Sequence, residues 1–464
     1  MFGGRKRTAR QDEDGAGTRP AERYVVGELD DHDEALPDVP VPEPGTWQAP
    51  DALEQHLYDL LTRHARGEWA DAEAAEEARG DLILGYLEAL AGDLVYVPFR
   101  REETAPDPGL RTFPVQDTRI GRLVAVYTRG LLPRPHPHVV YEAYTLRELA
   151  DDLPDDVDGI AVNQRTPCPL LLAADAEERQ VWRALHNEHW DEDGRADRLV
   201  TRRTGAPPTG PLLHGLALGA QMCFVNGEAW NNPHYHGLGL SMEHERLAKW
   251  WGVTGRAEWQ ETQRRLLDRE ITPWYWEFVL DTRATLAHRH TDGRLQAVDA
   301  TVWRERVETA LRERAAHLPE DELGPDWADF VAHVVGLVGQ VPRYEARFRA
   351  DGLLAPDAAV RSVAAWDLGR ASMMARWGYG ARFATRSEMR EAVVEASRAA
   401  QSAHTSWPDF SAGYALGRCL HFDDEEFGGW YQEMLAAHQA LSTHPDSPWN
   451  TVPFHLPQGA RLGG

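Results

Sequence analysis

The sequence predicts an α+β domain followed by a mostly α-helical domain, with a disordered tail at the N-terminus. The chain has 464 residues, more than one hydrophobic core usually supports. Short β-branched and aromatic runs gather between residues 94 and 173, and 13 of the 17 tryptophans lie between 211 and 454, where helical patterns dominate. We therefore expect a tail at 1–46, an α+β domain at 47–185, a linker at 186–210, a helical domain at 211–454 and a tail at 455–464.

The first 46 residues lack the apolar content that ordering needs. The stretch RKRTAR is basic, and ELDDHDEALPDVPVPEPG is acidic and rich in proline. Neither can bury enough apolar surface to offset the entropy lost on folding. Ordered structure is expected to begin near Asp51, which can cap a helix with Glu54 three residues later and leucines at helical spacing beyond.

The α+β domain is predicted from a change of period along the chain. A helical pattern over DLILGYLEALAG closes at Gly92, and Thr145 with Glu148 forms a capping box for a short helix. Runs bounded by Gly and Pro predict strands. These runs are 94–99, 111–115, 121–128, 138–145 and 159–173.

Five words in this domain resemble, in the same order, the SseB-type N-terminal domain over about residues 50–185. They are DLVYVPF, FPV, GRLVAVYT, YTLRELADDL and GIAVNQRTPCPLLL. The chain has Gln164 where that family often has proline after the asparagine. The resemblance implies an α+β fold and brings no activity that can be transferred.

The second half, about residues 211–454, resembles the domain-of-unknown-function family 1266. The words that carry this resemblance are NGEAWNN, LAKWWGVTGRAEWQETQRRLL, AWDLGRASMMARWGYGARF, SWPDFSAGYALGR and SPWNTVPF. The preceding segment, 186–210, is polar with Pro and Gly at its end, which is typical of a linker. The family resemblance implies no assigned activity.

Composition excludes several classes of protein. The formal net charge of -25 would repel a nucleic-acid backbone, and no apolar run is long enough to span a membrane. The three cysteines lie far apart, so we expect neither a disulfide framework nor a cysteine zinc site, and a reducing cytoplasm fits best.

Lys6 and Lys249 are the only lysines among 49 basic residues, which indicates the coding bias of a GC-rich bacterium. No cofactor motif is present, so we expect no cofactor.

The stretch NGEAWNNPHYHGLGLSMEHERLAKWW is rich in histidine and glutamate. Asn, Pro and Gly place His234 and His236 in a loop, and Ser241 can cap the next helix, whose dipole would favour Glu243 and Glu245. A zinc site needs further ligands that no H-E-x-x-H or C-x-x-C motif supplies. We expect a packed loop without structural zinc; a metal site and another binding role are the alternatives.

A second group of residues lies on a predicted apolar helix face. In VAAWDLGRASMMARW, Asp367 and Arg370 fall within an apolar arc of about 120° and can pair, while Arg376 points to the opposite side and is expected to be solvated. Thr385 with Glu388, and Ser406 with Asp409, cap the two following helices. If these helices pack together, a polar cluster forms from Asp367, Arg370, Tyr414, Arg418 and His421.

Three interpretations of this cluster remain open. They are a hydrogen-bonded network that fixes helix register, an anion pocket, and acid–base catalysis by Asp367 and His421. The sequence contains no recognised nucleophile, phosphate loop or metal motif. It therefore favours a cytoplasmic interaction or regulatory protein with a protein partner, and the alternative is a small-anion sensor or enzyme that uses the cluster. A cleft beside the cluster would favour the alternative.

Overall fold

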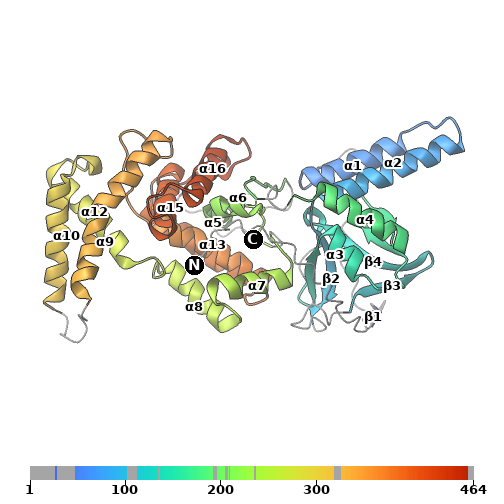
Figure 1. Cartoon of the computed structure of the whole chain (residues 1–464), viewed down its shortest axis with the longest axis horizontal. Helices are drawn as coiled ribbons and strands as arrows, with labels where there is room; N and C mark the ends of the chain where they lie inside the picture. The colour runs from blue at the N-terminus through green and yellow to red at the C-terminus, as the bar shows by residue number, and fades with distance from the viewer. Residues whose placement is uncertain are drawn as a thin grey trace.

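The computed structural model of the protein describes residues 27–28, 47–101, 112–133, 136–191, 196–203, 207, 209–234, 237–317 and 326–457. Within these ranges the chain forms a mixed sheet with flanking helices and then a helical region, which confirms the predicted fold class. The two parts lie end to end, with the sheet at one end and the helices of residues 274–350 at the other (Figure 1). The predicted tail at 1–46 lies outside the described residues apart from Gly27–Glu28, and the second tail does so from residue 458 onward.

The α+β domain follows the predicted order of elements. Asp51 caps the first helix, where its carboxylate accepts from the backbone N–H of Leu53 at 3.0 Å, and the Thr145 to Glu148 capping box is present. The elements are β1 (Gly27–Glu28), α1 (Ala52–Ala65), α2 (Ala72–Ala91), β2 (Val95–Arg100), β3 (Pro114–Thr118), β4 (Gly121–Thr128), the 3-10 helix η3 (Arg129–Leu131), β5 (Val139–Tyr144), α3 (Leu146–Asp152), β6 (Gly159–Val162), β7 (Leu170–Ala173) and α4 (Ala176–His189).

The last predicted strand, 159–173, is divided by a turn into β6 and β7. Asn163 and Arg165 adopt positive φ angles of 49° and 58° in this turn. The side chain of Asn163 is buried and accepts from the backbone N–H of Thr128 at 2.9 Å. This hydrogen bond ties the turn to the end of β4, so the asparagine has a structural role.

The sheet is mixed, with β4 near its centre. β4 pairs antiparallel with β2 and β3 and parallel with β6, while β5 and β7 lie beyond β2 and β6. One face packs on α1 to α4 around Leu57, Tyr86, Leu149 and Trp182. The opposite face carries a smaller aromatic cluster that includes Tyr96, Tyr127 and Tyr141.

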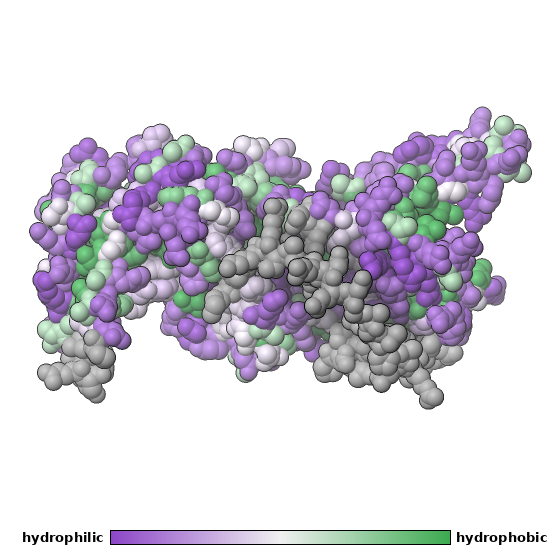
Figure 2. All heavy atoms as spheres, in the orientation of Figure 1, coloured by the Kyte–Doolittle hydropathy of each residue, from purple (hydrophilic) through white to green (hydrophobic). Residues whose placement is uncertain are grey.

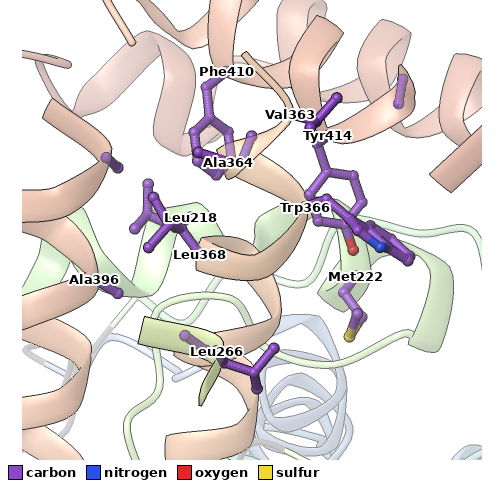
Figure 3. Packing of buried hydrophobic residues seen from close by; sticks show 14 of the residues in the cluster. Leu218, Met222, Leu266, Val363, Ala364, Trp366, Leu368, Ala396, Phe410 and Tyr414 are labelled. Carbon is purple, nitrogen blue, oxygen red and sulfur yellow. The ribbon is translucent and has the colours of Figure 1, made fainter. Parts of the chain in front are cut away.

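The helical domain contains a second and larger core. Its helices are α5 (Pro211–Leu218), α6 (Ala220–Asn226), α7 (Leu240–Trp251), α8 (Arg256–Leu267), α9 (Trp274–His290), η4 (Leu295–Ala297), α10 (Ala300–Ala315), α12 (Trp327–Ala350), α13 (Ala364–Gly380), α14 (Arg386–Ala403), α15 (Trp407–Phe422), α16 (Gly429–Thr443) and α17 (Pro448–Thr451). In this core Trp366 of α13 lies beside Tyr414 of α15, and Leu218, Leu368 and Phe410 belong to the same cluster (Figure 3).

The predicted caps of the helical domain are confirmed with one exception. Thr385 with Glu388 begins α14, and the hydroxyl of Ser406 accepts from Asp409 at the start of α15. Ser241, however, does not cap α7, because this helix begins at Leu240 and Gly239 occupies the N-cap position, two residues before Ser241. A Cβ atom on Gly239 would lie 2.3 Å from the backbone nitrogen of Ala143, so this glycine is needed where the chain passes β5.

The two domains meet along β2, β5 and the segment that leads into α7. The hydroxyl of Tyr96 donates to the carbonyl of Gly237 at 2.7 Å, and Arg129 donates to the carbonyl of Gly227 at 3.1 Å. The backbone N–H of Ser241 donates to the carboxylate of Glu142 at 3.1 Å. The stretch singled out for its histidines therefore forms much of the joint between the domains.

Hydrophilic residues cover most of the visible surface (Figure 2). In the part of the chain that the structure describes, no helix has the length and apolar character needed to cross a lipid bilayer.

Candidate functional site

The predicted loop histidine, His234, lies at the joint between the domains and is partly buried. Its backbone N–H donates to the side chain of Asn232 at 3.0 Å, and its ring lies 5.7 Å from that of Tyr379. Burial and then nearby arginines, Arg386 first, lower the pKa of His234 to about 4. His236 lies outside the described residues. Within those residues, no group of three or more His, Cys, Asp or Glu side chains could hold a metal ion, and the absence of zinc stays a prediction.

The same stretch holds a buried charge cluster that the sequence analysis missed. The guanidinium of Arg246 donates to the carboxylates of both Glu228 and Glu243, and it lies 4.4 Å above the ring of Trp377. Burial raises the pKa of Glu243 to about 7, although Arg246 opposes this change. The helix dipole was therefore an incomplete explanation of Glu243, because this side chain is buried and shares one arginine with a second carboxylate.

The predicted pair of Asp367 and Arg370 is in contact inside the helical domain. Asp367 has no exposed surface, and the guanidinium of Arg370 donates to its carboxylate. Thr272 completes the site, since its backbone N–H and hydroxyl donate to the two carboxylate oxygens at 3.0 and 2.8 Å. Arg370 also lies 4.1 Å above the ring of Trp366. Both carboxylate oxygens therefore have partners within the protein.

The other three residues of the predicted cluster differ in their surroundings. The ring of Tyr414 meets that of Trp366 edge to face at 5.1 Å (Figure 3), and burial raises its pKa to about 12. Arg418 pairs with Glu433 and lies 4.8 Å above the ring of Trp430. His421 is exposed. The structure thus brings Asp367, Arg370 and Tyr414 together around Trp366, places Arg418 close by, and leaves His421 at the surface.

Arg376 was expected to be solvated, and this expectation is wrong. It has no exposed surface and donates to the carbonyls of Ala229 and Asn232 and toward the sulfur of Cys223, 3.1 Å away. All residues of α13 from Ala364 to Tyr379 are buried, because other helices surround it. A helix at the centre of a core has no solvent side, so the apolar arc indicated only part of its buried surface.

A cleft in the helical domain adjoins the buried pair. It encloses about 730 Å³ between α9 and the segment that precedes α13. Its lining residues come from both walls: Asp268, Arg269, Thr272, Pro273, Trp274, Glu277, Asp281, Ala284, Gly293, Leu295, Arg361, Ser362, Val363, Ala364 and Ala403. A second lobe of about 350 Å³ shares Gly293, Leu295 and Arg361 with it. Thr272 connects the cleft to the buried pair, because it lines the cleft and its backbone N–H donates to Asp367.

Two carboxylates of α9 face this cleft. Burial is the main cause that raises the pKa of Glu277, and the negative charge of Asp281 raises it further. Burial also raises the pKa of Asp281, while Arg269 opposes this change. Glu277 accepts from the backbone N–H of Val363 at 2.9 Å. This site was not predicted from the sequence, although Glu277 and Asp281 are spaced to share one face of a helix, a signal equal to that of Asp367 and Arg370.

Residues 246–454 match the family described as "Protein of unknown function (DUF1266)". The resemblance noted for the second half of the chain is confirmed over this range, which begins at 246 rather than 211. No curated protein and no solved structure matches the chain. All residues that line the cleft lie within the matched range.

Proposed function

We propose that this is a non-enzymatic regulatory protein whose helical domain binds a small polar molecule in the cleft. The observation that carries the proposal is the cavity of about 730 Å³, lined by acidic, basic and aromatic side chains. Binding sites for small molecules are usually concave, with a few polar groups that orient the ligand. The cavity lies wholly within the range that matches the family.

The buried pair supports this assignment to the cleft rather than to the predicted cluster. Asp367 is occupied by Thr272 and Arg370, so an anion entering there would have to displace existing hydrogen bonds. Thr272 itself lines the cleft. In the proposed role the pair fixes the position of Thr272, and the cleft receives the ligand.

The α+β domain would supply the contact with a protein partner. For this domain we propose kinship with the SseB-type domain over about residues 50–185, on the basis of its five sequence words. The three free cysteines, Cys168, Cys223 and Cys419, are buried, which suits the proposed cytoplasmic location. Ligand binding in the helical domain would act on the partner through the joint at Gly237 and Ser241.

A screen of small polar metabolites by thermal shift tests the proposal. Ala284 is exposed and lines the cleft, so Ala284→Phe should fill space there while the protein still folds. The matched control is Thr285→Phe, which changes the next exposed residue of α9 outside the cleft lining. A ligand at about 100 times its dissociation constant should stabilise the protein by about 2.7 kcal/mol.

The expected result is at least one compound whose shift is present in the wild type and Thr285→Phe and absent in Ala284→Phe. A compound that shifts all three proteins equally binds elsewhere. If every active compound behaves in that way, or if no compound is active, the proposal is wrong.

A further inference from the structure

One stripe of α9 presents an aromatic ring and two carboxylates to the cleft. Trp274, Glu277, Asp281 and Ala284 recur at intervals of three and four residues, and all four line the cavity. Such a stripe places the ring and both acids along a single wall. A ligand in the cleft would meet all of these groups together.

The carboxylate part of this wall lacks a full complement of positive charge. Among the described residues, no Lys, Arg or His nitrogen lies within 4.0 Å of the carboxylate of Glu277 or Asp281, although Arg269 acts on Asp281 and His404 acts on Glu277 from farther away. The backbone N–H of Val363 and the side chain of Ser362 give Glu277 hydrogen bonds without a formal charge. Burial and mutual repulsion raise the pKa of Glu277. A cation between the two acids would offset both effects by stabilising the ionised carboxylates.

Trp274 already shows that its ring attracts positive charge. The guanidinium carbon of Arg314 lies 4.7 Å from the centre of this ring, and the side chain is 45% exposed. Tryptophan is the aromatic residue that interacts best with cations. At the edge of a cleft, three residues from Glu277, it adds a contact that suits an ammonium group and has little value for an anion.

His404 provides a buried polar group beside this region. It is 2% exposed, and its Nδ1 lies 3.6 Å from the carboxylate of Asp409. Its Nε2 has no hydrogen-bond partner among the described residues. The neighbouring residues Ala403 and Thr405 line the two lobes of the cleft, and the charge of His404 acts on Glu277. His404 itself is not among the residues that line the cleft, and a positive charge on its ring favours the ionised form of Glu277.

We propose that the ligand of the cleft is a small protonated amine, held by Glu277 and Asp281 and covered at the edge by Trp274. This inference rests on the proposed function and adds the chemical class of the ligand. Arg361 is exposed and lines both lobes, so it can bind a carboxylate at the other end of the same molecule. An amine that also bears a carboxylate would therefore bind more tightly than a simple amine.

Four small compounds of similar length can test the charge requirement: butylamine, putrescine, γ-aminobutyrate and butyrate. The protein is labelled with fluorotryptophan, and the resonance of Trp274 is assigned from Trp274→Phe. We expect butylamine, putrescine and γ-aminobutyrate to shift this resonance in a saturable manner, and butyrate to leave it unchanged. Each of Glu277→Gln and Asp281→Asn should weaken amine binding by about tenfold or more, as expected for a lost hydrogen bond to a charged group.

Glu305→Gln, an exposed change on α10 outside the cleft, is the matched control and should bind the amines as the wild type does. Equal binding of butyrate and butylamine, or no binding of any amine, would overturn the inference. So would unchanged amine binding by Glu277→Gln and Asp281→Asn.

The metabolite screen separates this failure from that of the proposed function. If the compounds blocked by Ala284→Phe are all neutral or anionic, the cleft remains a binding site and a protonated amine as its ligand is refuted. A screen in which no compound is blocked by Ala284→Phe would refute both.

Discussion

Two acidic side chains of the helical domain differ in the partners that the protein gives them. Asp367 is fully buried and receives three hydrogen bonds, from Arg370 and twice from Thr272. Glu277, in the wall of the adjoining cleft, is only partly buried and receives hydrogen bonds from the backbone N–H of Val363 and the side chain of Ser362, without a close cationic partner in the described chain. The first carboxylate is electrostatically complete within the protein, whereas the second has capacity left for a ligand. A charged residue on an apolar helix face is therefore not by itself a functional site, and its existing partners decide its role.

The largest change in stability is expected at the buried pair of Asp367 and Arg370. Arg370→Met leaves the carboxylate of Asp367 without its cation, and Asp367→Asn leaves the guanidinium unpaired. Each single change should lower the free energy of unfolding by about 3 to 5 kcal/mol. The double variant should lose clearly less than the sum, since asparagine still accepts from Thr272 and no uncompensated charge remains. Denaturant unfolding of the three variants measures these values.

An exposed pair provides the control for this cycle. Arg312 and Glu308 form an ion pair on the surface of α10, and Arg312→Met should cost no more than about 1 kcal/mol. If all Asp367 and Arg370 variants lose only a little free energy of unfolding, the structural role of the pair is refuted and the anion-pocket interpretation of these residues is favoured.

A smaller effect is expected at Glu243, which is intermediate between the two kinds of acid. Its pKa is raised by burial from the ordinary 4.5 to about 7, although Arg246 is in contact. Between these two values the folded protein holds more protons than the unfolded chain, so stability should fall as pH rises. Glu243→Gln should remove about 1 to 3 kcal/mol of this fall. The measurement is the free energy of unfolding against pH for both proteins.

Only the difference between wild type and variant is informative here, because other groups titrate in the same range. The pKa values of the buried His214 and His438 are lowered to about 4, and their effect has the opposite sign. Glu245→Gln, at an exposed neighbour of Glu243, should reproduce the wild-type curve. Identical pH profiles for wild type and Glu243→Gln would contradict the raised pKa.

The sequence predicted local features better than it predicted the surroundings of single side chains. The cap at Asp51, both capping boxes and the contact of Asp367 with Arg370 depend on residues a few positions apart, and all are present. The partner Thr272 lies 95 residues from Asp367 and was missed. Spacing along one helix cannot reveal a partner from another, since the tertiary contact exists only in the folded chain.

The errors have the same physical origin. Arg376 lies opposite the predicted apolar face, yet α5 to α8, α14 and α15 pack around α13 and enclose that side too. Ser241 fits a capping position, but close passage of the chain at Gly239 moves the start of α7. The cleft could not be predicted, because its opposite wall comes from residues 361–364, almost 80 residues beyond Ala284.

The smallest change in stability is expected for Glu277, the carboxylate that lines the cleft. Burial raises the pKa of this carboxyl, so between its ordinary and raised values the folded protein holds the extra proton and stability falls as pH rises. Glu277→Gln removes this fall and keeps an oxygen that can accept from Val363. At neutral pH the variant should therefore be as stable as the wild type or slightly more stable, with a change below about 1 kcal/mol. A loss as large as that expected for Asp367→Asn, measured by the same denaturant unfolding, would show that Glu277 is a structural acid and would remove the distinction between the two carboxylates.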